Sequence, residues 1–201
     1  MDKMNRLLIA TNNPGKVEEL HALLKDLPIQ LVTPADIDLV LDVDEDGETY
    51  AENAEKKALA FAKASGLTSL ADDSGLEVDA LNGAPGLYSA RYLAKPGATD
   101  ADRRAYLIKN LVDKPRPWSA RFRATIAIAV PKQGVQLAEG DCIGEIIPEE
   151  RGTGGFGYDP IFLIDKLGRT MAELDMDEKN LISHRARAVM NAIPILEKIF
   201  K

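Results

Sequence analysis

The stretch RLLIATNNPGK, residues 6–16, gives the first indication of how this chain folds. Residues 6–10 have the apolar character of a buried strand, and the polar turn after them leads into Pro14, a residue suited to the first turn of a helix. Apolar residues then recur at helical spacing, which predicts a helix over residues 14–27. A strand that leads directly into a helix is the start of an α/β unit.

The same alternation continues along the first third of the chain. Residues 29–33 are expected to form a second strand and residues 67–71 a third. Between them, residues 49–65 predict a helix that opens with a Thr-x-x-Glu capping box and stops at Gly66. The order strand, helix, strand, helix, strand predicts parallel pairing in an α/β sheet.

The later part of the chain adds antiparallel structure. Residues 119–130 and 135–147 read as two long strands joined by Pro131-Lys-Gln-Gly134, which predicts a hairpin. Helices are expected at residues 99–112 and 177–200, and Pro194 should kink or divide the second of them. The predicted fold is a mixed α/β sheet with flanking helices and an antiparallel hairpin extension.

Composition narrows the function classes. The chain has 201 residues, 45% hydrophobic and 28% charged, as in ordinary globular proteins, and enough for one generous domain or two small lobes. Its net charge of −7 argues against a protein that binds nucleic acid through a broad basic face. The single cysteine, Cys142, allows no internal disulfide. Neither a signal peptide nor a membrane span is recognisable, so we expect a cytoplasmic protein.

The segment LADDSGL, residues 70–76, is the most informative for chemistry. It predicts a strand that delivers Asp72 and Asp73 to a tight turn at the edge of the sheet. Adjacent carboxylates are costly unless a cation neutralises them, and Mg²⁺ with substrate phosphates is a common solution. The alternative is a solvated turn, because Asp-Ser-Gly is ordinary turn chemistry.

Two other segments are candidates for the phosphate and metal site. The turn Thr11-Asn12-Asn13-Pro14-Gly15-Lys16 joins a strand to a helix N-terminus, an arrangement that binds phosphate. The alternative there is an ordinary helix capped by Asn13, with Lys16 solvated. The acidic run of residues 42–48 is most often a solvated loop, but Asp44 or Glu45 is well placed to complete a metal site with Asp73.

Base recognition is expected in the last third. The glycine loop of residues 152–160 contains Phe156, Gly157, Tyr158 and Asp159. The two aromatic rings can stack on a purine, and the aspartate can accept from base or ribose donors. The alternative is a flexible loop with one aromatic ring in the core.

The helix expected at the C-terminus carries a further set of donors. Lys179, His184 and Arg185 lie on it together with Ser183. Donor-only groups suit purine acceptors or phosphate oxygens. The alternative for a lone histidine such as His184 is a structural role, but its neighbour Arg185 favours recognition.

Four motifs therefore stand in order: ATNNPGK, ADDSGLEVDALNGAPGLYSARY, GTGGFGYDPIF and EKNLISHRARA. Together they resemble the inosine triphosphate pyrophosphatase family, in particular its bacterial dITP/XTP pyrophosphatases, over essentially the whole chain. The resemblance implies Mg²⁺-dependent hydrolysis of non-standard purine nucleoside triphosphates (ITP, dITP, XTP and dXTP) to the monophosphate and pyrophosphate. It also implies a single domain over residues 1–201, with two lobes around a central nucleotide cleft, that works as a homodimer.

The resemblance also implies roles for particular residues. Asp73 would be the proton acceptor and a magnesium ligand, Ser74 would contact substrate, and residues 11–16 would hold the triphosphate. Residues 156–159 with Lys179, His184 and Arg185 would hold and read the base. The family's glutamate ligand maps less cleanly, onto Asp44 or Glu45. No nucleic acid or membrane partner is implied.

Two rival functions are left open. One is a pyrophosphatase for modified pyrimidines or for a wider range of nucleotides, which would keep the phosphate chemistry and change the base pocket. The other is a nucleotide-binding sensor without turnover. The Asp72–Asp73 pair counts against a sensor, because a binding module has little use for a site that activates water.

Overall fold

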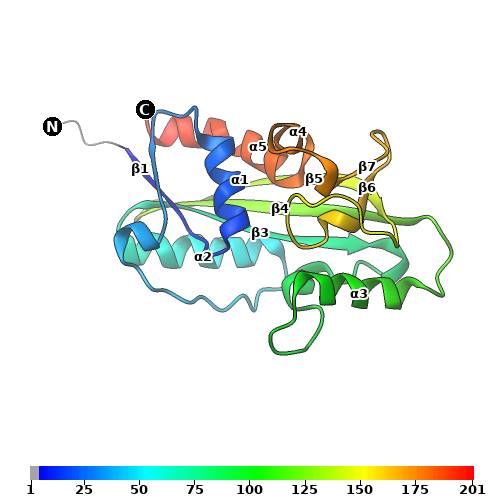
Figure 1. Cartoon of the computed structure of the whole chain (residues 1–201). Helices are drawn as coiled ribbons and strands as arrows, with labels where there is room; N and C mark the ends of the chain where they lie inside the picture. Colours follow the sequence, from blue (N-terminus) through cyan, green and yellow to red (C-terminus); the bar gives the residue numbers. More distant parts are fainter. Residues whose placement is uncertain (1–4) are drawn as a thin grey trace. The chain divides into compact units, whose positions relative to one another are not determined.

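The computed structural model describes residues 5–201 and shows a mixed seven-stranded sheet with flanking helices (Figure 1). The strand order is β2-β1-β3-β4-β5-β6-β7. The strands are β1 (Arg6–Ile9), β2 (Gln30–Val32), β3 (Thr68–Val78), β4 (Trp118–Val130), β5 (Gly134–Ile146), β6 (Phe162–Ile164) and β7 (Arg169–Thr170). The α-helices are α1 (Pro14–Leu24), α2 (Tyr50–Ser65), α3 (Asp100–Leu111), α4 (Met176–Ile182) and α5 (His184–Ile199). The predicted fold class is confirmed.

The chain divides into two compact units. The first contains the described residues up to Asp73, together with Ala124–Gly140 and Arg185–Lys201. The second contains Ser74–Arg123 and Asp141–His184. No helix within residues 5–201 is both long enough and apolar enough to cross a membrane.

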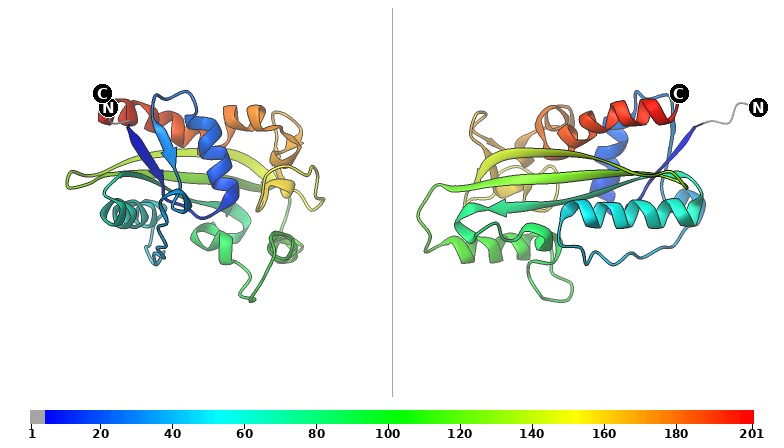
Figure 2. Two further views of the ribbon diagram at one scale, coloured as in Figure 1. Left: turned by 60° about the vertical axis from the view of Figure 1, so that its left-hand side comes forward. Right: turned by 180° about the vertical axis from the view of Figure 1, so that it is seen from behind.

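The first unit is built around β1, which pairs in parallel with β2 and with β3. Leu7 and Ile9 pack with residues of α1 and α5 on one face, whereas Leu8 and Ala10 pack with residues of α2 on the other. Figure 2 shows these helices on opposite faces of the sheet. Because β1 is covered on both faces, its sequence is a continuous apolar run without alternation.

The second unit contains an antiparallel part of the sheet. In β5 and β6, Ile146 lies opposite Phe162, and β6 pairs in turn with β7. Helix α3 contributes Leu107 and Leu111 to a core shared with Leu76 and Trp118. The predicted hairpin is confirmed, since neighbouring strands β4 and β5 are joined by a short turn; that turn belongs to the first unit.

Two predictions about element ends are wrong. The third strand does not stop at Ala71 but continues to Val78, so Asp72 and Asp73 lie inside β3 and not in a tight turn. Buried Leu76 and Val78 hold the extension in the core. The C-terminal helix divides at Ser183, whose backbone is extended, and Pro194 lies within α5. An interior proline removes a backbone donor and crowds the carbonyl four residues before it, yet α5 continues through Pro194 with one face buried in the core.

Candidate active site

Strand β3 places two buried carboxylates next to each other in the first unit. Asp72 is fully buried and receives two cations on Oδ2: Lys16 Nζ at 2.7 Å and Arg185 Nη2 at 3.1 Å. Burial alone would raise the pKa of Asp72, but Arg185 and Lys16 outweigh burial and hold the pKa well below its ordinary value of 3.8. Asp72 is therefore an ionised carboxylate that holds the side chains of Lys16 and Arg185 in place.

Its neighbour Asp73 has the opposite electrostatics. The side chain is almost completely buried, and burial raises its pKa above the ordinary value. Lys57 partly offsets this rise, whereas Glu45 and Asp72 add to it. Two adjacent carboxylates with pKa values pushed apart are a common signature of acid–base chemistry.

Lys57 connects Asp73 with the acidic loop before α2. Its Nζ lies 2.5 Å from Glu45 Oε1, 4.0 Å from Asp73 Oδ1 and 2.9 Å from the main-chain oxygen of Asp72. An ammonium group thus lies beside both carboxylates. Asp44 is exposed, so Glu45 is the acidic-loop carboxylate that the structure brings to this position.

The donor set around Lys57 fits a magnesium ion that is shared with substrate. Residues 5–201 contain no group of three or more His, Cys, Asp or Glu side chains arranged to hold a metal. However, Mg²⁺ is commonly held by one or two carboxylates, with waters and substrate phosphates as its other ligands. Asp73 and Glu45 supply such a pair.

The turn from Thr11 to Lys16 follows β1 and opens α1. Asn13 caps the helix, with its Oδ1 accepting from Lys16 N at 3.1 Å, and Thr11 Oγ1 accepts from Asn13 N at 3.2 Å. The Asn13 cap, which the alternative to phosphate binding expected, is present. The alternative of a solvated Lys16 is wrong, because its Nζ pairs with buried Asp72. Burial lowers the pKa of Lys16, and Asp72 opposes that effect.

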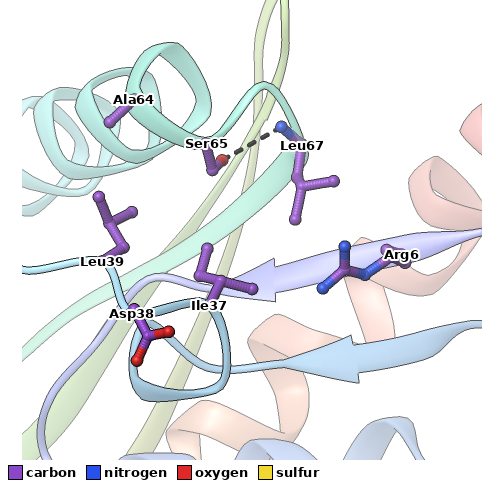
Figure 3. A pocket seen from close by; sticks show the side chains of 7 residues that line it. All are labelled: Arg6, Ile37, Asp38, Leu39, Ala64, Ser65 and Leu67. Atoms are coloured by element: carbon purple, nitrogen blue, oxygen red, sulfur yellow. Dashed lines mark hydrogen bonds between the residues drawn. The ribbon is translucent and has the colours of Figure 1, made fainter.

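Two of the cavities in the first unit lie at opposite ends of β1. One of about 530 Å³ is beside the turn and is lined by Thr11, Asn12 and Pro14 together with Val17, Glu18, His21, Thr33, Pro34 and Ala35. The other, of about 270 Å³, is lined by Arg6, Ile37, Asp38, Leu39, Ala64, Ser65 and Leu67 (Figure 3). Arg6 begins β1, whereas the Thr11 turn follows that strand, so the second cavity is at the opposite end of β1. Only the first cavity contains residues predicted to bind phosphate.

Arg185, predicted to help read the base, lies buried beside the carboxylate pair of the first unit. Only 1% of it is exposed, and its guanidinium bridges Asp72 and Glu19. Glu19, a buried charge on α1, is not among the site residues predicted from the sequence. One feature of the sequence could have indicated that Glu19 is buried: it directly precedes Leu20, a residue on the apolar face of the helix. The geometry makes Arg185 a partner of the carboxylate pair.

In the second unit, the glycine loop and α4 meet at Asp159. Asp159 Oδ2 accepts from Lys179 Nζ at 2.6 Å and from Phe156 N at 3.0 Å, and all three groups are sheltered. Lys179 Nζ also lies 5.3 Å from the centre of the Phe156 ring, within the range of a cation–π contact. The structure therefore brings together Phe156, Asp159 and Lys179, as predicted.

The other predicted base-binding residues lie differently. Tyr158 is buried in the core, where its hydroxyl donates to Ser89 O at 2.9 Å and burial raises its pKa. It is thus the one aromatic ring of the loop that enters the core. His184 stacks on Phe122, with ring centres 4.7 Å apart. Ser74, predicted to contact substrate and not the base in particular, is half-buried in β3.

Glycine is required in the loop where the chain passes close to other groups. Gly155 has φ +67°, and a Cβ there would lie 2.0 Å from Asp159 Oδ2. Gly152 has φ +79°, and a Cβ there would lie 2.3 Å from the backbone of Ala172. Both positions therefore exclude a side chain for two reasons, conformation and space.

Comparison with known proteins gives a consistent result. A model of the Ham1 family matches residues 7–195. A dITP/XTP pyrophosphatase of Desulforamulus reducens is 50% identical, covering 97% of each chain, and one of Geobacter sulfurreducens is 47% identical, covering 92% of this chain and 94% of that protein. The solved structure of a HAM1 protein from Coxiella burnetii is 41% identical with a TM-score of 0.86, covering 97% of this chain and all of that one. The chain belongs to the Ham1 family.

Proposed function

We propose that this chain is a nucleoside triphosphate pyrophosphohydrolase that cleanses the nucleotide pool. Its substrates are the non-standard purine nucleotides dITP, ITP, XTP and dXTP, and its products are the monophosphate and pyrophosphate. The observation that carries the proposal is the carboxylate pair of β3, in which Asp72 is locked by Lys16 and Arg185 while the pKa of Asp73 is raised. The relatives named dITP/XTP pyrophosphatase support the substrate class.

Asp73 and Glu45 would hold Mg²⁺, with Lys57 displaced from its position beside both carboxylates. The bound ion would neutralise phosphate charge and make the α-phosphorus a better electrophile. Of the two acidic-loop candidates, we retain Glu45 and set Asp44 aside. Phosphate oxygens would complete the coordination.

Asp73 is the general base of the proposed reaction. It takes a proton from water, and the water oxygen forms a bond to the α-phosphorus. The bond from that phosphorus to the oxygen bridging to the β-phosphorus breaks, and pyrophosphate leaves with the electron pair. A carboxylate with a raised pKa is a stronger base than an ordinary aspartate, and burial gives Asp73 that property.

The first unit would also bind the triphosphate. The backbone from Thr11 to Gly15 and the N-terminus of α1 present N–H groups to an anion. Lys16 adds positive charge from its place on Asp72. Ser74, the first residue of the second unit, is proposed to contact substrate through its hydroxyl. Arg185 is then a residue that fixes Asp72, and we no longer assign it to the base.

Base recognition is assigned to the second unit. Phe156 offers a ring for stacking, and Gly157 and Asp159 shape the loop beside it, with Lys179 and His184 as donors. Tyr158 supports the loop from the core. Donors facing C6 favour hypoxanthine and xanthine, which carry an oxygen there, over adenine, which carries an amino group.

We further propose that the chain acts as one domain over residues 1–201, in the cytoplasm and as a homodimer, without a nucleic acid or membrane partner. These features follow the resemblance of the four motifs. The net charge of −7 supports the absence of nucleic acid binding.

The decisive experiment measures pyrophosphate release with Mg²⁺ from dITP and XTP against dATP, dGTP and dTTP. We expect rapid release from dITP and XTP and little from the standard nucleotides. Equal rates on all five would keep the phosphate chemistry and refute the base assignment. Tight dITP binding with no release would indicate a sensor.

A further inference from the structure

Two side chains from the first turns of α3 form hydrogen bonds with the backbone of the glycine loop. Gly157 N donates to Asp100 Oδ2 at 2.9 Å, and Arg104 Nη1 donates to Gly157 O at 2.8 Å. Both hydrogen-bonding groups of one backbone residue are thus bound by side chains one helical turn apart. Neither Asp100 nor Arg104 belongs to the four motifs that indicate the function.

The same arginine also fixes the chain just before the loop. Arg104 Nε and Nη2 each lie 2.8 Å from a carboxylate oxygen of Glu150, a two-point ion pair. Arg104 therefore connects Glu150, before the loop, with Gly157 inside it. Its side chain is only 12% exposed, so it is less mobile than an ordinary surface arginine.

Asp100 is also held in place by a second contact. Its second oxygen, Oδ1, is paired with Arg103, which in turn donates to Ala98 O at 2.8 Å. Burial alone would raise the pKa of Asp100, but hydrogen bonds from Arg103 and from the Gly157 amide outweigh burial and lower the pKa. The carboxylate is therefore ionised when it accepts from the loop.

Packing does not enforce the conformation of Gly157. Its φ is +62°, yet no heavy atom of the described residues lies within 4 Å of the place where a Cβ would be. Gly155 differs, because it is confined by Asp159 and Lys179. The left-handed geometry of Gly157 is therefore held by hydrogen bonds: the two from α3, and a turn bond within the loop from Asp159 N to Phe156 O at 3.2 Å.

We propose that Asp100 and Arg104 are positioning residues that hold the glycine loop in its nucleotide-binding conformation and thereby set the affinity for the purine base. This role rests on the proposed function. It adds to the proposed site two residues of α3, a helix outside the four motifs. Because the loop would be ordered before substrate arrives, binding would not incur the cost of ordering it. Chemistry at Asp73 would not depend on this contact.

The kinetic test compares Asp100→Ala and Arg104→Gln with the wild-type protein on dITP and XTP. Each variant is expected to raise KM about tenfold, the loss typical of one charge-assisted hydrogen bond, and to leave kcat within about twofold. Asp100→Asn keeps an acceptor oxygen and should recover part of the loss. The matched control is Arg121→Gln, which removes another ion pair of the same unit, from Arg121 to Glu77.

A second measurement does not depend on substrate. Exchange of the Gly157 amide hydrogen, followed by NMR, should be about tenfold faster in Asp100→Ala and unchanged in Arg121→Gln. The unfolding midpoint of each variant shows whether the effect is local. Faster exchange without a large drop in the midpoint supports positioning of the loop.

Three results would overturn the inference. They are unchanged Gly157 exchange, a KM effect equalled by Arg121→Gln, or a loss in kcat with unchanged KM. A wild-type protein that does not hydrolyse dITP or XTP would instead refute the proposed function, and with it the link to base affinity. The two failures are therefore distinguishable.

Discussion

The carboxylate site of the first unit consists of charged side chains, whereas the glycine loop of the second unit consists mainly of backbone. The first consists of side-chain charges: Lys16, Lys57 and Arg185 converge on the Asp72–Asp73 pair from distant parts of the chain. The second is a short run of backbone with little charge of its own, shaped by glycines and held by neighbouring helices. The difference suggests that hydrolysis depends on focused charge, whereas base recognition depends on backbone held in one conformation.

The dependence of hydrolysis on charge is tested most directly by removing the carboxylate that acts as the base. Asp73→Asn should lower kcat by about 10²–10⁴-fold, the usual range for loss of a general base, while the unfolding midpoint changes little. Pyrophosphate release at saturating dITP and Mg²⁺ measures the effect. Asp79→Asn is the control, since Asp79 is an exposed carboxylate just after β3. Substantial turnover in Asp73→Asn would refute its role.

Removing the buried cation tests whether the first site also supports the fold. Arg185→Met should lower the free energy of unfolding by about 3–5 kcal/mol, because Glu19 loses its cation and Asp72 loses one of two. Urea unfolding followed by circular dichroism measures this change. The exposed Arg187→Met on the same helix should change stability by less than about 0.5 kcal/mol. Similar effects from both variants would show that the buried network is dispensable.

The glycine loop should respond in binding and not in chemistry. Gly155→Ala places a Cβ against Asp159 and should raise KM for dITP about tenfold, with a smaller effect on kcat. Gly168→Ala is a close control: its φ is +63°, and no described heavy atom lies within 4 Å of the added Cβ. Because both variants carry the same backbone strain, a difference between them reports the close contact. Equal KM values would mean that space at Gly155 is unimportant.

The smallest expected effect is a shift in pH dependence. Lys57 lowers the pKa of Asp73, so Lys57→Gln should raise that pKa further. Catalysis needs ionised Asp73, and its ionised fraction falls as the pH drops through the pKa. The acid limb of kcat/KM should therefore move to higher pH in Lys57→Gln. Lys56→Gln, an exposed neighbour paired with Asp46, should leave the limb in place. A shift of the limb to lower pH would contradict the assignment.

Local patterns predicted much of the molecule. The order of strands and helices, the hairpin, the Asn13 cap and the Gly66 stop all follow from residues within a few positions of one another. Thr49 caps α2 as expected, although Glu52 returns its bond to Glu48 N and not to Thr49 N. These features depend on short-range sterics and hydrogen bonds, which a sequence displays directly.

Long-range charge pairing was not predictable in the same way. Arg185 and Glu19 are 166 positions apart, and Arg185 and Asp72 are 113 apart. A turn is predicted after Ala71 because the apolar run ends there in Asp-Asp-Ser-Gly, which is typical of turns. Without nearby cations, a strand carrying two adjacent aspartates would have to expose them. Burial of Asp72 with Lys16 and Arg185 removes that requirement and lets β3 continue.

By itself, the sequence determined the α/β class, the resemblance to a pyrophosphatase family and the set of groups available for chemistry. Tertiary structure decided which of two adjacent aspartates is locked and which has a raised pKa, and it selected Glu45 over Asp44. It also placed Arg185 in an ion pair with Asp72. The physical reason is that burial and charge act through space, whereas capping, turns and periodicity act along the chain.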